Sequence, residues 1–280
     1  MVDKGPDIYA RMGVRAVINA QGNRTLLGGS ATVPEVTEVM QAVNNTYVAM
    51  RELLERSGEY IADMLGVEAA YVTSGASAAL ALSAAACMTG RDPDRIAQLP
   101  DTSGMKNEII IQKAQRYAYD RSYTVPGAKL IEAGDEHGCS EKQLKNVIGP
   151  DTAAIAYFIT PDNTDSMLSL EQVVEVGRAV GLPTIADAAA QIYPLDYFKK
   201  NAQSADLVCF GAKYLGASQS SGFVCGNKEL VQAASDHGFI AFQHNNGRSF
   251  GRPMKLDKQE IVGVVTAIER WLTMNHEDRL

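Results

Sequence analysis

Pro183-Thr184-Ile185-Ala186-Asp187 is a short apolar stretch that closes on a carboxylate, and it decides how this chain folds. Its length and composition are typical of a buried strand. A second apolar stretch at residues 206–210 repeats the pattern and runs into Gly211-Ala212-Lys213. Lys213 stands 26 residues after Asp187, which leaves room for one helix and one strand between them. The two stretches therefore predict a strand–helix–strand unit with a charged side chain at the end of each strand.

Short apolar stretches alternate with amphipathic ones along the rest of the chain. We expect further strands at residues 69–73, 108–112, 129–132, 153–160 and 223–225, the last with its direction left open. We expect helices at residues 34–43, 50–65, 170–180 and 258–273, and an alanine-rich helix between a turn at 74–77 and Gly90. Residues 14–19 are expected to be extended. This alternation is typical of an α/β fold with a mostly parallel sheet flanked by helices.

The composition indicates a globular protein with a substantial core. Of the 280 residues, 46% are hydrophobic, and the formal net charge is -7. An acidic balance argues against a nucleic-acid partner, because neutralising phosphates requires clustered lysines and arginines. No apolar stretch is long enough to cross a bilayer, and residues 1–10 do not resemble a secretory signal. We therefore expect a cytoplasmic protein with no membrane partner.

The cysteines and histidines are not predicted to carry chemistry. The cysteines lie far apart and without metal-ligand spacing, so we expect free thiols and no metal site. They are Cys87, Cys139, Cys209 and Cys225. The histidines stand in polar stretches, so we expect solvated side chains. They are His137, His237, His244 and His276.

Polar groups follow three of the predicted strands at the point where each strand ends. They are the turn Ser74-Gly75-Ala76-Ser77, Asp187 and Lys213. In parallel sheets ligands bind at the carboxyl ends of the strands, so these groups predict one site. The free N–H groups of the helix that opens at the turn suit a phosphate, although a serine-rich helix cap needs no ligand. The turn matches neither the P-loop nor the dinucleotide fingerprint.

Lys213 and Asp187 suit a cofactor that carries an aldehyde and a basic ring. A lysine at the end of a buried strand is costly when charged, and condensation with an aldehyde removes that cost. A desolvated carboxylate needs a cationic partner, and a protonated pyridine is one. Taken singly, the two residues also fit a surface lysine and a helix N-cap. Ala189 is small enough to lie against a ring, and Gln191 can donate a hydrogen bond nearby.

The chain order of phosphate turn, aspartate and lysine resembles that of fold type I pyridoxal-phosphate (PLP) enzymes, which share the aspartate-aminotransferase fold. Within this fold the chain resembles the SelA-like branch, which includes selenocysteine synthase and the D-glucosaminate-6-phosphate ammonia-lyase group. The similarity covers nearly the whole chain. It is carried by segments 17–22, 27–30, 71–76, 185–191, 211–213, 219–222 and 251–255.

The resemblance implies PLP as the cofactor and a role for the three predicted strand ends. Lys213 would hold PLP as a Schiff base and act as acid and base at the substrate α-carbon. Asp187 would hold the pyridine nitrogen. The phosphate would lie in the turn, whose residues are Ser74, Gly75, Ala76 and Ser77.

The resemblance also implies residues around the cofactor ring and from a second subunit. Gln219 and Ser220 would complete the site of a neighbouring subunit, so we expect a homodimer or a larger homo-oligomer. The residue that stacks on the ring is expected after the strand at 108–112. Gln115 is favoured there over Arg116 and Tyr117.

The expected domain organisation has three parts. Residues 1–45 form an N-terminal segment, 46–250 the PLP-binding large domain, and 251–280 the start of a C-terminal helical region. The family continues into a small domain beyond this length, so the resemblance implies that most of the small domain is truncated or absent. Residues 216–219 also differ from the Gly-Pro-Gln sequence that the family often has after the lysine, so the resemblance says less about the geometry of this loop around the phosphate.

The leading functional hypothesis is an α,β-elimination of the ammonia-lyase or dehydratase type. The substrate would be an amino acid or an amino-sugar acid, phosphorylated or not. Selenium transfer and amino transfer are alternatives, and the acidic charge argues against a tRNA substrate. A third alternative is a non-catalytic protein of the same fold, acting as a binding or regulatory partner. The intact pair of Lys213 and Asp187 argues against it.

Overall fold

One seven-stranded sheet forms the centre of the molecule. The computed structural model describes residues 7–161, 164, 166–243 and 248–279. The strand order is β1-β7-β6-β5-β4-β2-β3, in which β7 runs antiparallel to both β1 and β6 and the other pairs are parallel. The strands are β1 (Ala69–Thr73), β2 (Glu108–Gln112), β3 (Lys129–Ala133), β4 (Thr152–Phe158), β5 (Thr184–Asp187), β6 (Leu207–Gly211) and β7 (Gly222–Gly226). The mostly parallel α/β sheet predicted from the sequence is confirmed.

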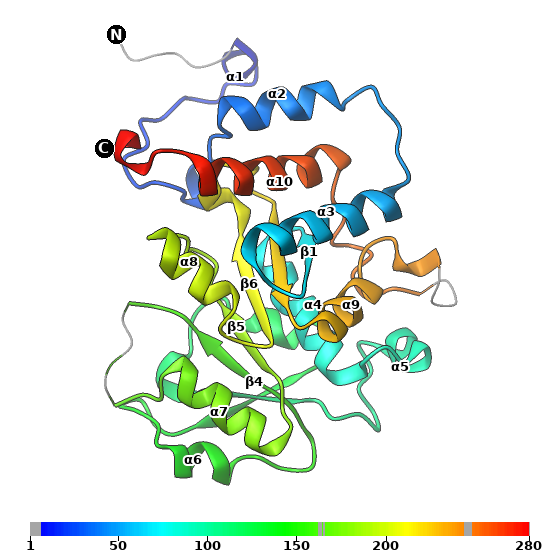
Figure 1. The fold of residues 1–280 in the computed structure, drawn as a ribbon, viewed down its shortest axis with the longest axis vertical. Coiled ribbons are helices and arrows are strands. Elements are labelled where there is room, and N and C mark those ends of the chain that lie inside the picture. The colour runs from blue at the N-terminus through cyan, green and yellow to red at the C-terminus, as the bar shows by residue number, and fades with distance from the viewer. Residues whose placement is uncertain (1–6, 162–163, 165, 244–247, 280) are drawn as a thin grey trace.

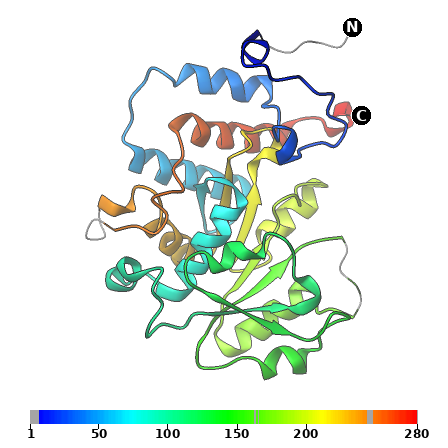
Figure 2. The same ribbon diagram turned by 180° about the vertical axis from the view of Figure 1, so that it is seen from behind.

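Helices cover the sheet and form a further layer beyond one of its ends (Figure 1 and, from behind, Figure 2). The α-helices are α1 (Asp7–Arg11), α2 (Pro34–Ala42), α3 (Met50–Leu65), α4 (Gly75–Thr89), α5 (Pro93–Gln98), α6 (Glu141–Asn146), α7 (Leu170–Val180), α8 (Leu195–Ala202), α9 (Lys228–Asp236) and α10 (Lys258–Thr273). Helix α4 packs against β4, β5, β6 and β7, whereas α7 packs against β4 and β5. Helix α10 lies against both α2 and α3. Of the helices in the described residues, none is long and apolar enough to span a membrane.

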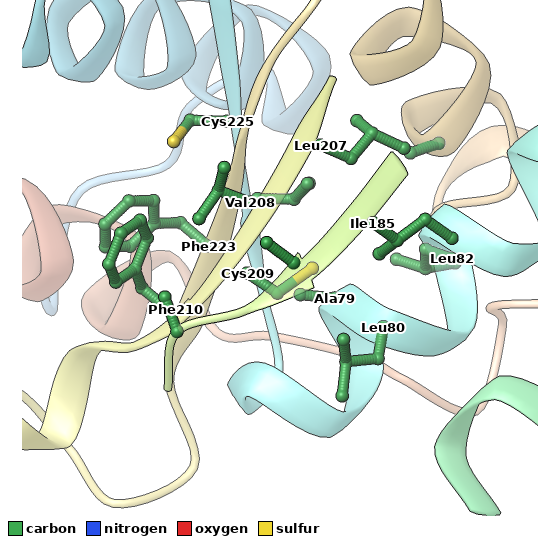
Figure 3. Packing of buried hydrophobic residues seen from close by; sticks show 14 of the residues in the cluster. Ala79, Leu80, Leu82, Ile185, Leu207, Val208, Cys209, Phe210, Phe223 and Cys225 are labelled. Atoms are coloured by element: carbon green, nitrogen blue, oxygen red, sulfur yellow. The ribbon is translucent and has the colours of Figure 1, made fainter. Parts of the chain in front are cut away.

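The core explains why α4 is rich in alanine. Eleven of its fifteen residues are buried, because the helix lies between the sheet and neighbouring helices. Small side chains allow this close approach. In Figure 3 Leu82 of α4 lies beside Ile185 and Ala79 of α4 lies beside Cys209, while Phe210 and Phe223 lie together on the other side of the strands. The Phe210 and Phe223 rings stack with centroids 5.0 Å apart. Burial on both faces also explains why the central strands are continuously apolar.

Most of the predicted elements lie where the sequence placed them. Helix α8 is the helix expected between Asp187 and Lys213, and β7 takes the antiparallel direction that was left open. Residues 14–19 pair with no strand in the described part of the chain. Helices α1, α5, α6 and α9 were not anticipated. The predicted domain boundaries stay a prediction. Helix α2 belongs to the predicted N-terminal segment and α10 to the predicted C-terminal region, and these two helices pack against each other.

The four cysteines are free, as expected, but one histidine differs from its prediction. His237 is fully buried, because the segment at 249–251 covers it with a bond from Gly251 N to its carbonyl. Its Nε2 lies 2.8 Å from Thr89 Oγ1, and its Nδ1 has no partner among the described residues. His137 is exposed, His276 bonds to Trp271 O, and His244 lies outside the described residues.

Candidate active site

Pairing across the sheet brings the three predicted strand ends together. Gly222, the first residue of β7, pairs with Thr73 on one side and with Gly211 on the other. The start of α4 therefore lies on one side of Gly222 and the loop of Lys213 on the other. Asp187 ends the next strand, where it pairs with Cys209. The carboxyl ends of β1, β5 and β6 thus meet at one edge of the sheet, where an α/β fold binds its ligands.

Asp187 is a buried carboxylate, with a relative exposure of 3%. Its Oδ1 accepts a hydrogen bond from the backbone N–H of Ala189 at 3.0 Å, and its Oδ2 accepts one from the Tyr117 hydroxyl. Burial raises the pKa of Asp187, and the two hydrogen bonds only partly offset this rise. No cation pairs with this carboxylate within the described part of the chain. Its environment therefore favours a cationic ligand.

Lys213 follows β6 in a short 3-10 turn, Ala212–Leu215. Its Nζ donates to the Asn23 carbonyl at 3.2 Å and to Thr25 Oγ1 at 3.4 Å, and it lies 5.1 Å from the centre of the Tyr214 ring. In the described residues no carboxylate is within ion-pairing distance of this ammonium group. Burial lowers the pKa of Lys213. A lower pKa increases the fraction of free amine, which is the form that attacks an aldehyde.

The start of α4 is open for an anion. Ser74 occupies the N-cap position but its side chain makes no capping hydrogen bond, so the first N–H groups of the helix have no side-chain acceptor. Gly75 has a φ of +85°, a conformation that side chains rarely adopt. A Cβ atom at Gly222 would lie 2.8 Å from the Ala76 nitrogen, so only glycine lets β7 approach this turn. Free N–H groups and the helix dipole suit a phosphate.

Ala189 and Gln191 hold the loop that follows Asp187. The Ala189 carbonyl accepts a bond from Gly211 N at 3.0 Å, which ties this loop to the strand end before Lys213. The Gln191 side-chain amide donates to the Ile159 carbonyl at 3.2 Å, just beyond the end of β4. Both residues therefore lie at the site.

Gln219 and Ser220 lie between the turn that carries Lys213 and the start of β7. The buried Oε1 of Gln219 has no hydrogen-bond partner among the described residues, and its side chain packs against Gly29. The Ser220 hydroxyl donates to Glu260, in the first turn of α10. Their expected role toward a neighbouring subunit stays a prediction.

The loop after β2 places Tyr117, and not Gln115, beside Asp187. Gln115 is buried, and its amide donates to the Phe158 carbonyl at 3.0 Å. The ring of Tyr117 instead lies parallel to that of Phe158, with centroids 4.1 Å apart and an interplanar angle of 1°. The stacking role expected of Gln115 stays a prediction, and the sequence did not show that the loop would turn Tyr117 toward Asp187.

An N-terminal segment covers Lys213 and was missed as part of the site. Besides its contacts with Nζ, this segment is held by a bond from Asn23 Nδ2 to the Lys213 carbonyl at 3.3 Å. Ser30 Oγ donates to the Ala217 carbonyl at 2.7 Å, and Val33 N to the Gly216 carbonyl at 3.1 Å. The glycine-punctuated loop at 22–30 was the available signal, but nothing in it indicated a partner 190 residues away.

The donor set fits PLP. A buried carboxylate without a cation suits the ring nitrogen, a lysine with a lowered pKa suits the aldehyde, and an open helix N-terminus suits the phosphate. The three lie at one edge of one sheet. Fold and site together define the chain as a fold type I PLP-dependent protein.

Comparison with known proteins supports this class. No protein-family model matches the chain. It is 35% identical over 272 residues to a D-glucosaminate-6-phosphate ammonia lyase of Salmonella typhimurium, covering 95% of this chain and 70% of the relative. It is 31% identical over 280 residues to a 5'-C-glycyluridine monooxygenase-decarboxylase of a Streptomyces species, covering 97% of this chain and 67% of the relative.

Solved structures give the same result. A D-glucosaminate-6-phosphate ammonia-lyase structure superposes with a TM-score of 0.86 at 32% identity, covering 97% of this chain and 72% of that one. An aspartate aminotransferase of Thermus thermophilus shares the fold, with a TM-score of 0.57 at 17% identity over 95% of this chain and 69% of its own. The chain belongs to the SelA-like branch of the fold type I PLP-dependent enzymes, the family of D-glucosaminate-6-phosphate ammonia lyase.

Proposed function

We propose that the protein is a PLP-dependent ammonia-lyase that acts on an amino-sugar acid carrying a phosphate. The supporting observation is 35% identity over most of the chain to a D-glucosaminate-6-phosphate ammonia lyase, together with an intact Lys213 and a buried Asp187. A protein that had lost catalysis would have no physical reason to keep a buried carboxylate whose pKa is raised by burial.

Each residue of the site has a proposed task. PLP, when bound, supplies an electron sink for the charge that develops at the substrate α-carbon. Lys213 holds the cofactor and moves the proton at the α-carbon, for which its lowered pKa is suited. Asp187 keeps the ring nitrogen protonated, with Ala189 and Gln191 supporting its loop.

The turn at the start of α4 provides the phosphate cradle through Ser74, Gly75, Ala76 and Ser77. Asn23 and Thr25 hold Lys213 in place from the N-terminal side and limit the access of water to it. Elimination then removes the α-proton and the β-hydroxyl, the latter as water, and hydrolysis gives an α-keto acid and ammonia.

The direct test is incubation of the purified protein and PLP with D-glucosaminate 6-phosphate. We expect equal amounts of an α-keto acid and ammonia, and loss of both with Lys213→Ala. Transfer of the amino group to an added keto acid without ammonia release would contradict the lyase assignment.

A second candidate reaction is favoured by the Streptomyces relative, a monooxygenase-decarboxylase that is 31% identical to this chain. It predicts oxygen uptake and carbon dioxide release from an α-amino acid substrate in place of ammonia release alone. Measuring dissolved oxygen and carbon dioxide in the same incubation separates the two reactions.

We also propose that the protein is a cytoplasmic homo-oligomer. Large apolar side chains are exposed in the N-terminal region, where Ile18, Leu26 and Tyr47 are 83%, 92% and 96% accessible. The first two flank the residues that bond to Lys213, so a second copy that covers them would also shield the site. Light scattering after gel filtration is expected to give a dimer or a larger species, and a monomer would contradict the proposal.

A further inference from the structure

Tyr117 makes a contact that the proposed reaction does not use. Its hydroxyl donates to Oδ2 of Asp187, the carboxylate proposed to hold the cofactor ring. The other oxygen, Oδ1, is occupied by the backbone N–H of Ala189. Asp187 is only 3% exposed, and among the described residues Tyr117 is the only side chain that donates a hydrogen bond to it.

The position of the Tyr117 ring is fixed by its surroundings. Its backbone N–H donates to Asp120 Oδ2 at 3.3 Å, and its carbonyl accepts from Asp120 N at 3.2 Å. Asp120 is itself buried and paired with Arg116. The ring lies flat on Phe158, at the end of the strand beside β5. A pinned backbone and a stacked ring aim the hydroxyl at Asp187.

The hydrogen bond from Tyr117 stabilises Asp187 when the cofactor is absent. An ionised carboxylate in a dry site is unstable without a donor, and burial already raises the pKa of Asp187. Burial, the neighbouring Tyr123 and the charge of Asp187 raise the pKa of Tyr117, so this phenol stays protonated and donates. The Tyr123 hydroxyl is also fully buried beside this pair.

We propose that Tyr117 is a placeholder for the cofactor: its hydroxyl holds Asp187 in the empty protein, and its release from Asp187 sets the affinity for PLP. The inference rests on the proposed cofactor site. Loading exchanges a neutral O–H donor for a cationic ring N–H donor, which binds a carboxylate more strongly. The bond to Tyr117 must first break, so it subtracts from the binding free energy of PLP.

The test is Tyr117→Phe, with Tyr119→Phe as the matched control. Tyr119 meets the same ring edge-on but is 69% exposed, and it forms no hydrogen bond with Asp187 in the described residues. A hydrogen bond to a charged group corresponds to roughly a 10- to 100-fold change in an equilibrium constant. Titration of cofactor-stripped protein with PLP is therefore expected to show binding tighter by about this factor for Tyr117→Phe and unchanged binding for Tyr119→Phe.

Thermal unfolding gives an independent readout. Tyr117→Phe is expected to lower the unfolding temperature of the stripped protein and to leave that of the PLP-loaded protein close to wild type. A PLP affinity in Tyr117→Phe that is equal to or weaker than that of wild type overturns the inference while the cofactor site stands. An equal gain in PLP affinity in Tyr117→Phe and Tyr119→Phe overturns it as well. If neither wild type nor variant binds PLP, the proposed function and this inference fail together.

A fluorine label keeps the inference testable should the variant not fold. With 3-fluorotyrosine at position 117, the ¹⁹F resonance is expected to shift in proportion to the PLP bound, because the hydroxyl leaves Asp187. A resonance that stays unchanged at saturating PLP would overturn the inference.

Discussion

A single methyl group at Gly222 is predicted to damage the phosphate cradle. A Cβ atom there would lie 2.6 Å from the Gly75 carbonyl carbon, 2.6 Å from the Phe210 carbonyl oxygen and 2.8 Å from the Ala76 nitrogen. All three are backbone atoms, so no side-chain rotation relieves the overlap. In Gly222→Ala, β7 must therefore separate from the start of α4.

The magnitude follows from two separate effects. Overpacking of this kind costs about 2 kcal/mol of unfolding free energy, which for a chain of this size lowers the unfolding temperature by roughly 4 to 8 °C. Displacing one N–H group from the phosphate removes a hydrogen bond to a charged group, which weakens PLP binding by roughly 10- to 100-fold.

The assay is thermal unfolding and PLP titration of Gly222→Ala beside Gly149→Ala. Gly149 has open space where a Cβ atom would go, so its substitution is expected to change neither quantity. Wild-type PLP affinity in Gly222→Ala would refute the placement of the phosphate at the start of α4.

Two further predictions concern buried ionisable groups. Asp187→Asn is expected to weaken PLP binding at least about tenfold, measured by titration. The variant without cofactor is expected to be as stable as wild type, because burial disfavours the carboxylate that is removed. Unchanged PLP affinity would argue against the role of Asp187 at the ring nitrogen. Burial lowers the pKa of His237 to about 4, below its ordinary value of 6.5, so the unfolded chain binds a proton first and stability falls as the pH drops from 6.5 toward 4. Denaturant unfolding is expected to show about 2 to 3 kcal/mol less stability at pH 4.5 than at pH 8, and His237→Gln should lose this part of the difference; the same pH dependence in both proteins would contradict the assignment.

The sequence predicts the parts of the site that depend on strand ends. Asp187 and Lys213 each follow an apolar run, and parallel strands bring such ends together whatever the loops do. The turn at Gly75 could be placed for the same reason. The fold class therefore follows from short stretches of local sequence, whereas the cofactor and the family followed from the resemblance that those stretches carry.

The parts that depend on loop conformation could not be predicted. Tyr117 faces Asp187 because Asp120 pins its backbone, and Asn23 reaches Lys213 from 190 residues away. His237 stands beside polar residues in the sequence but is covered by Gly251, far along the chain from it. The placements of Asn23 and His237 are decided by tertiary contacts that leave no local pattern.

Some missed helices did carry local signals. Asp92 and Pro93 are a standard N-cap and first-turn pair, and the Asp92 carboxylate accepts a bond from Asp94 N at 3.0 Å at the start of α5. Ser140 and Gln143 form a capping box at the start of α6. Helix α5 was therefore missed although its own sequence carries the signal for a helix start.

The absorbance spectrum of the purified protein with added PLP tests whether Lys213 holds the cofactor. Lys213→Ala is compared with Lys199→Ala, which removes an exposed lysine of α8. We predict a yellow band in wild type and in Lys199→Ala that is absent in Lys213→Ala, and a borohydride-fixed cofactor mass on the peptide containing Lys213. A protein that binds no PLP, or a cofactor mass fixed on another lysine, would contradict this role of Lys213.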